Sequence, residues 1–180
     1  MQSGTKLVVG LAGVAIAAGI ASWWYRYESA HRSTEFWGPV AAEVIARPER
    51  VNAFSVERES HQNDSPTAST ETLTIGKQRL LIGNLRDVTS ARGMMHLGSL
   101  LLTDRNFNWQ TAVEVPRWRW GLRFEAPAGE ATVVFDEDFE AIGLVDSRGT
   151  VRSLDCRPLA LTLREYFTKS EVFGASTVRE

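Results

Sequence analysis

The sequence has little of the chemistry that metal and redox sites need. Its 180 residues include a single cysteine, Cys156, and three histidines. One cysteine cannot form an internal disulfide, and His31, His61 and His96 lack the spacing of metal ligands. The chain therefore predicts no disulfide framework, no zinc site and no cofactor.

The chain also lacks an excess of charge of one sign. Its 20 basic and 22 acidic residues give a formal net charge of −2. A protein that neutralises many phosphates usually carries a basic excess or a basic stripe. No Gly-rich phosphate loop, GxSxG, HExxH or DNA-reading signature is found either. We therefore expect no nucleic-acid partner.

One long apolar run is present near the N-terminus. From Leu7 to Tyr25 the chain reads LVVGLAGVAIAAGIASWWY, without a charge. At about 1.5 Å per residue this run reaches roughly 28 Å, close to the ~30 Å thickness of the hydrocarbon core. Trp23, Trp24 and Tyr25 lie where an interfacial aromatic belt belongs. The prediction is a single-pass membrane protein with a tail over residues 1–6, a transmembrane helix over 7–25 and a juxtamembrane linker over 26–33.

A cleaved signal peptide is the alternative interpretation of this segment. Gly19 and Ala21 have the spacing that signal peptidase needs, and Lys6 could serve as the basic n-region. The run is longer than a usual h-region, which favours a retained anchor. The short preceding tail favours a signal-anchor with the domain on the extracytoplasmic side, although the flanking positive charges are nearly balanced.

Residues 34–170 predict one water-soluble α+β domain, with helices packed on a mostly antiparallel meander sheet. Helices are expected from an N-cap at Ser33 to Ala46, from Thr89 or Ser90 to Thr103, and from Pro158 onward. Strands are expected over residues 51–57, 73–75, 79–82, 117–125, 131–135, 139–145 and 151–154. Most of the connections in the second half are too short for parallel crossovers. The polar stretch 59–72 predicts a flexible loop, and residues 171–180 a C-terminal tail.

The segment RWRWGLRFE gives the clearest strand signal. Its aromatic and aliphatic residues alternate with arginines, which predicts one core face and one basic face. The expected core face carries Trp118, Trp120, Leu122 and Phe124. The basic face carries the candidate binding residues Arg117, Arg119 and Arg123, joined by Arg148 and Arg152 on neighbouring strands. These arginines could hold anionic headgroups or an acidic partner, or could pair across strands with Glu114, Glu125 and Glu130.

Two further clusters could carry chemistry. Asp136, Glu137 and Asp138 form the densest carboxylate group, which could bind a cation but is fully explained by an exposed hairpin turn. Cys156 precedes a helix and could be a nucleophile with His96 as its base, or a small buried hydrophobic residue. Asp155 is suited to cap the terminal helix.

The second half of the chain resembles small uncharacterised bacterial exported or membrane-anchored α+β proteins. The resemblance is carried by LLLTDRNFNW, the WGLRF strand, ATVVFDEDFEAI and DCRPLALTLREYF, within residues 87–167. It implies a bacterial, envelope-facing context and provides no activity and no site residue.

Three functions remain open on the sequence. The first is a membrane-tethered, non-enzymatic domain that binds or scaffolds a protein partner in the bacterial envelope. The second is an enzyme built around Cys156 and His96. The third is a small-ligand-binding module that uses Trp118, Trp120 or Trp109, which requires one of these rings to line an open concave site.

Overall fold

The structure, a computed structural model, describes residues 2–29, 32–58, 71–76, 78–111, 113, 116–170 and 172–173. Side chains are described for all of these except 2–9, 11, 25–29 and 58. The predicted loop over 59–72 therefore lies mostly outside the described residues, and so does most of the predicted tail over 171–180.

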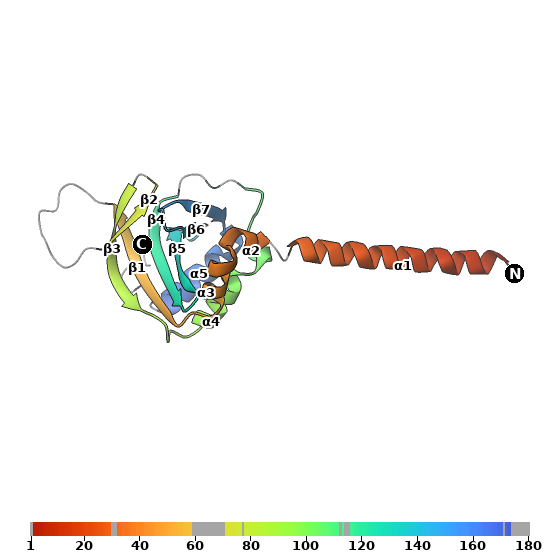
Figure 1. The fold of residues 1–180 in the computed structure, drawn as a ribbon, viewed down its shortest axis with the longest axis horizontal. Helices are drawn as coiled ribbons and strands as arrows, with labels where there is room; N and C mark the ends of the chain where they lie inside the picture. The colour runs from red at the N-terminus through yellow and green to blue at the C-terminus, as the bar shows by residue number, and fades with distance from the viewer. Residues whose placement is uncertain are drawn as a thin grey trace, which may run out of the picture.

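Seven strands form one antiparallel sheet in the order β2-β3-β1-β4-β5-β6-β7 (Figure 1). The strands are β1 (Arg50–Arg58), β2 (Thr72–Ile75), β3 (Gln78–Asp87), β4 (Trp118–Ala126), β5 (Gly129–Asp136), β6 (Ala141–Val145) and β7 (Val151–Asp155). The helices are α1 (Gln2–Ser29), α2 (Arg32–Trp37), α3 (Pro39–Ala46), α4 (Met94–Leu101), the 3-10 turn η1 (Asp104–Asn106) and α5 (Arg157–Lys169). The predicted α+β class and the β4–β7 meander are confirmed.

The sheet curls until its two distant hairpins meet. The backbone N–H of Gly76, in the β2–β3 turn, donates to the carbonyl of Gly149, in the β6–β7 turn, at 2.8 Å. A Cβ on Gly149 would lie 2.5 Å from the carbonyl oxygen of Thr74, so only glycine permits this approach. The curl turns the second face of the sheet inward, where a smaller apolar cluster around Phe54, Val56, Leu80 and Ile82 is buried.

The four domain helices cover the other face of the sheet and form the main core with it. Trp37 of α2, Leu97 of α4 and Phe167 of α5 are buried against strand residues such as Leu122 and Phe135. The indole N–H of Trp37 donates to the carbonyl of Leu101 at 2.7 Å, which satisfies a buried donor. Val172 and Phe173, placed in the tail by the sequence, are also buried in this core.

The single helix expected from Ser33 to Ala46 is wrong. Gly38 has a φ of +76°, a left-handed value, and Pro39 then starts a new helix, so the segment forms α2 and α3. Ser33 is not the N-cap either, because it lies inside α2. Its hydroxyl donates to the carbonyl of Leu102 at 2.8 Å.

The second predicted helix is shorter than expected. It begins at Met94, because Gly93 occupies the cap position with a φ of +89°. Thr89, one of the two expected caps, instead donates hydrogen bonds from its backbone N–H and its hydroxyl to the carboxylate of Asp87. The expected close packing of glycine is present at Gly98, where an added Cβ would lie 2.6 Å from the carbonyl oxygen of Ile45.

The N-terminal helix α1 lies outside the sheet and its covering helices (Figure 1). Its predicted role requires a membrane span over residues 7–25. Within the part of the chain that the structure describes, no helix is long and apolar enough to cross a membrane. Of the predicted span, the side chains of residues 7–9, 11 and 25 lie outside the described residues.

Candidate functional site

The candidate site is a gap between two neighbouring strands, β1 and β4. Their pairing runs from Arg50↔Glu125 to Ser55↔Trp120. Beyond that pair β1 continues to Arg58 alongside β3, and β4 has already started at Trp118. No β1–β4 pair is formed past Ser55↔Trp120 among the described residues, so the two strands separate there.

A β-bulge at Arg119 shapes the gap. Trp118 pairs with Asp136 and Trp120 with Phe135, so two steps along β4 match one step along β5. Such a bulge shifts the alternation of side chains and can redirect them. Trp120 therefore packs in the main core, whereas Trp118 packs on the second cluster. The expectation that both rings share one face is wrong for this reason.

A pocket of about 470 Å³ occupies the gap. Its apolar lining residues are Val56 and Leu80, which are almost fully buried, and Trp118, which is partly buried. The polar lining residues are Glu57, Gln78, Arg117, Arg119 and Glu137, with Pro116 beside them. One predicted ligand-binding indole and two of the three predicted arginines thus meet at one concave site.

Among the described residues, the charged side chains of this pocket form no ion pair. Neither Arg117 nor Arg119 has a carboxylate within 4.0 Å among the described residues. Neither Glu57 nor Glu137 has a basic group within 4.0 Å among the described residues. Arg119 lies over the ring of Trp120, at 5.7 Å from its centroid, which leaves its hydrogen-bond donors available.

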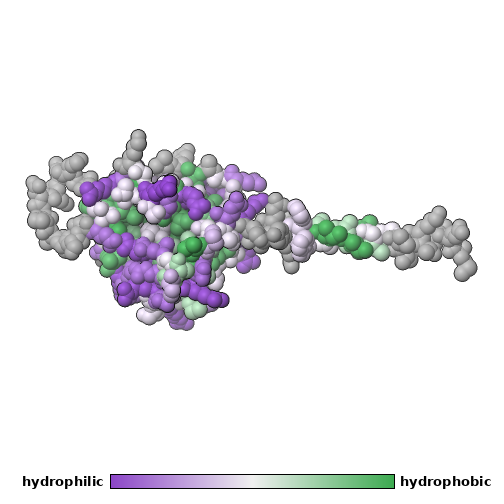
Figure 2. Space-filling model, in the orientation of Figure 1, coloured by the Kyte–Doolittle hydropathy of each residue, from purple (hydrophilic) through white to green (hydrophobic). Residues whose placement is uncertain are grey.

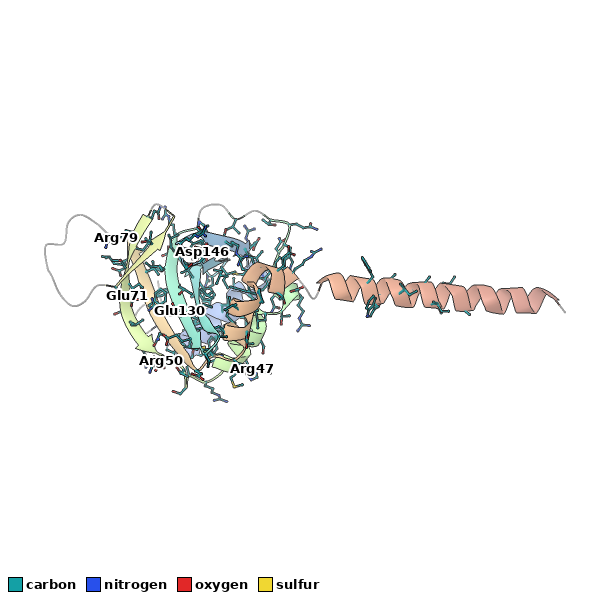
Figure 3. The ribbon with its side chains drawn as sticks, viewed as in Figure 1. Arg47, Arg50, Glu71, Arg79, Glu130 and Asp146 are labelled. Carbon is teal, nitrogen blue, oxygen red and sulfur yellow. The ribbon has the colours of Figure 1, made fainter. Side chains whose placement is uncertain are left out.

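The third predicted arginine, Arg123, has a different environment. Its guanidinium lies 2.7 Å from Glu71 and 3.2 Å from Glu130, and its side chain is only 17% exposed. It also covers the ring of Phe54. The alternative of cross-strand pairing is therefore confirmed for Arg123 with Glu130 (Glu71 and Glu130 are labelled in Figure 3).

Glu125 and Arg152 make other contacts. Glu125 accepts a hydrogen bond from the side-chain amide of Asn52 at 3.1 Å, and Glu114 lies outside the described residues. Arg152 donates to the carbonyls of Glu35 and Trp37 and so ties β7 to α2.

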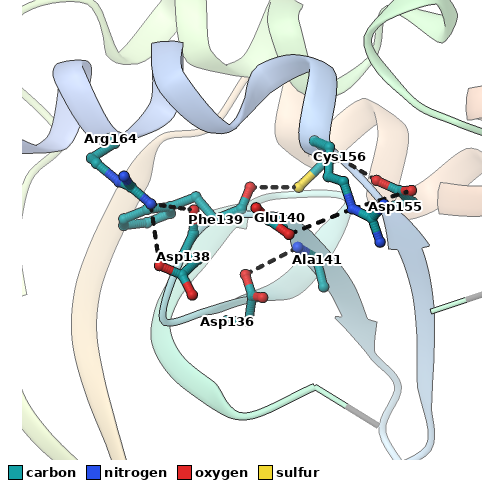
Figure 4. Close-up of polar contacts among 9 residues, drawn as sticks. Asp136, Asp138, Phe139, Glu140, Ala141, Asp155, Cys156 and Arg164 are labelled. Atoms are coloured by element: carbon teal, nitrogen blue, oxygen red, sulfur yellow. Dashed lines mark hydrogen bonds and ion pairs between the residues drawn. The ribbon is translucent and has the colours of Figure 1, made fainter. Parts of the chain in front are cut away.

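The acidic turn after β5 is a structural element (Figure 4). Asp136 accepts a hydrogen bond from the backbone N–H of Ala141 at 3.0 Å and closes the turn. Burial raises the pKa of the Asp136 carboxyl, and the nearby charges of Asp138 and Glu140 add to the effect. Asp138 pairs with Arg164 of α5 at 3.2 Å. Among the described residues no three potential ligands are placed to hold a metal ion.

Cys156 is enclosed beside this turn (Figure 4). Its side chain is fully buried, and its thiol donates to the carbonyl of Phe139 at 3.0 Å. Burial, with the negative charges of Asp136 and Asp155, raises the pKa of the Cys156 thiol far above its usual range. This environment opposes formation of the thiolate. The N-cap of α5 is Cys156 and not Asp155 as expected, but the carboxylate of Asp155 accepts the N–H of Arg157, the first residue of the helix, at 2.9 Å.

His96 belongs to a different surface from Cys156. It is exposed on α4 and lines an apolar groove of about 460 Å³ between α4 and α5. Tyr166 of α5 forms part of the same groove, and burial raises its pKa. The enzyme hypothesis needs the histidine beside the thiol, and the structure gives the two residues separate surroundings.

Of the tryptophans proposed for ligand binding, only Trp118 lines this pocket. Trp120 is 3% exposed in the main core, and Trp109 is half-buried with its N–H donated to the carbonyl of Asp104 at 2.9 Å. The sequence did not indicate Glu57 or Gln78 as site residues. They come from β1 and β3, and no local pattern shows that these strands border the arginines of β4.

Comparison with known proteins finds no match to the chain among protein-family models, curated proteins or solved structures.

Proposed function

We propose that the protein is a membrane-tethered, non-enzymatic binding domain whose ligand occupies the β1–β4 pocket. The observation that carries the proposal is the set of charged side chains at this pocket that have no ion-pair partner in the described part of the chain. Charged side chains in a concave site of this size, beside the partly buried Trp118, are typical of ligand recognition. The neighbouring Arg123 shows that the same sheet can neutralise an arginine internally when a carboxylate is in reach.

The tether is the second part of the proposal, and it rests on α1. Every described side chain of α1 is exposed, including Ile16 at 64% and Ile20 at 61%. In Figure 2 the coloured part of α1 is mostly hydrophobic, and the coloured surface of the domain is mostly hydrophilic. A helix that is apolar on all sides needs an apolar environment, which a protein core or a bilayer provides. The uncharged run over 7–25 and its terminal aromatic residues favour the bilayer.

Membrane fractionation tests the tether. The full-length protein should remain in the pellet after alkaline carbonate extraction. Introducing Ile16→Lys together with Ile20→Lys should release most of it, because a lysine costs about 2.5–3.5 kcal/mol at the centre of a spanning helix. The matched control is Met95→Lys with Leu161→Lys, two exposed apolar residues of the domain, which should not change the distribution. Wild-type protein in the soluble fraction would reject the tether.

Fluorine NMR tests the pocket. Tryptophans of the full-length chain, in lipid nanodiscs, are replaced by 5-fluorotryptophan, and the Trp118 and Trp120 signals are assigned with Trp118→Phe and Trp120→Phe. A library of small polar compounds should contain members that shift the Trp118 signal and leave that of buried Trp120 unchanged. If no compound affects Trp118 more than Trp120, the pocket is not a binding site.

A further inference from the structure

We infer that the ligand of the β1–β4 pocket is a short extended peptide with a free carboxylate and a free ammonium group. This inference rests on the proposed function and specifies the ligand class for the same site. Three features support it: the end of the β1–β4 pairing, the opposite charges and the partly buried Trp118 in the lining.

The strand edges favour a peptide over other small ligands. Val56 and Glu57 of β1 face Trp118 and Arg119 of β4 across the gap, without β1–β4 pairing. Backbone N–H and C=O groups at an unpaired strand edge are templates for another strand. An extended peptide satisfies such groups by adding main-chain hydrogen bonds, as in recognition by β-strand addition.

The charges specify the ends of that peptide. Arg117 and Arg119 present two guanidinium groups, which match a carboxylate in planar, bidentate geometry. Glu57 and Glu137 present two carboxylates in the same pocket, which suit an ammonium group. A simple anion would leave both glutamates unmatched, and a simple cation would leave both arginines unmatched. A ligand with both charges satisfies the whole set.

Trp118 provides the apolar contact for the side chain between the two ends. It lines the pocket and is only partly buried, whereas Val56 and Leu80 in the same lining are 1% and 3% exposed. Alternate side chains of an extended peptide point to opposite faces, so one apolar side chain can contact Trp118 while its neighbours point away.

Calorimetric titration of the full-length protein in nanodiscs tests the inference. The probes are alanyl-leucyl-alanine with free termini, the same peptide with an acetylated N-terminus and an amidated C-terminus, and inorganic phosphate. The free peptide should bind saturably, and the blocked peptide and phosphate should bind at least about tenfold more weakly, because each loses charge-assisted hydrogen bonds.

The affinities of pocket variants identify the side chains that bind the charged ends of the peptide. Arg119→Ala and Glu137→Gln should each weaken binding of the free peptide about tenfold. Arg119→Lys should restore part of the affinity, since it keeps the charge but not the fork of donors. Arg47→Ala is the matched control, because Arg47 is exposed at the end of α3 (Figure 3) and should not change the affinity.

Three outcomes would overturn the inference. Equal binding of phosphate would indicate a simple anion site. Equal binding of the blocked peptide would show that the pocket does not recognise the terminal ammonium and carboxylate groups. Absence of peptide binding would also reject it. If fluorinated Trp118 still responds to other compounds in that case, the binding function stands and only the ligand class is wrong.

Discussion

The two ends of β4 carry the same residue types in opposite states. At Arg123 the sheet is continuous, the guanidinium is paired with Glu71 and Glu130, and the glycine at position 121 lets Phe54 fill the space between strands. At Arg117 and Arg119 the pairing of β1 with β4 has ended, and both arginines line the pocket without a carboxylate within 4.0 Å among the described residues. The first end is closed and the second is open.

This contrast indicates that Arg123 stabilises the fold, whereas Arg117 and Arg119 are suited to bind a ligand. An ion pair on a sheet surface contributes little unless it is partly buried and satisfied by several acceptors, as at Arg123. An unpaired arginine at a pocket contributes little to folding and is available to a ligand. Substitutions at the closed end should therefore change stability, and substitutions at the open end should change binding.

The largest expected difference is in the labelling rate of a cysteine, compared between the buried position 156 and position 117 at the open end of β4. Native Cys156 should react with a disulfide reagent more slowly than the unfolded chain by a factor on the order of 10³ or more, since it is buried and its pKa is raised. An Arg117→Cys substitution, in a chain that also carries Cys156→Ala, should react at nearly the unfolded rate. Rapid labelling of native Cys156 would contradict its buried role and revive the enzyme hypothesis.

Next in size is the effect of filling the closed end. In Gly121→Ala the new Cβ would lie 2.2 Å from the Phe54 ring, so the ring or the strand must move. We expect a loss of about 2–3 kcal/mol in the free energy of unfolding, measured by urea denaturation. Adding Phe54→Leu should recover part of that loss. If the two substitutions are simply additive, the contact does not determine the packing.

A smaller difference should separate the arginines themselves. Arg123→Gln should cost about 1–2 kcal/mol, because it leaves Glu71 and Glu130 without their shared cation in a partly buried position. Arg117→Gln should change the free energy of unfolding by less than about 0.5 kcal/mol. Equal costs for the two variants would remove the distinction between a closed and an open end.

The smallest expected effect is that of Asp136, which pairs with Trp118 at the open end. Its folded-state pKa is raised by burial, so the folded chain holds this proton more tightly than the unfolded chain. The contribution of Asp136 to stability is therefore lost as pH rises through the raised pKa. Asp136→Asn keeps an oxygen for the N–H of Ala141 and avoids this loss. The stability of the variant relative to wild type should rise from pH 4 to pH 7, and a constant difference would contradict the assignment.

The sequence predicted Arg117, Arg119 and Trp118 as candidate binding residues, but it did not predict the other residues that line the pocket. The alternation in RWRWGLRFE placed Arg117 and Arg119 away from the core. It also placed Trp118 with Trp120, which is wrong, because the bulge depends on how β4 pairs with β5. Glu57 and Gln78 could not be found, since a strand pattern carries no information about which other strand lies beside it.

Local residue chemistry determined much of the fold before any packing was considered. Period-two patterns and short turns fixed an antiparallel meander, a proline-led amphipathic segment fixed α5, and the uncharged run fixed one long N-terminal helix. These features depend on neighbours within a few residues, where side-chain spacing and backbone preference act directly.

Only the tertiary structure decided the site. The curl that joins Gly76 to Gly149, the bulge at Arg119 and the separation of β1 from β4 are all set by contacts between distant segments. Whether an arginine of β4 forms an ion pair depends on which carboxylates the neighbouring strands bring within reach. The packing of the whole sheet determines which strands are neighbours.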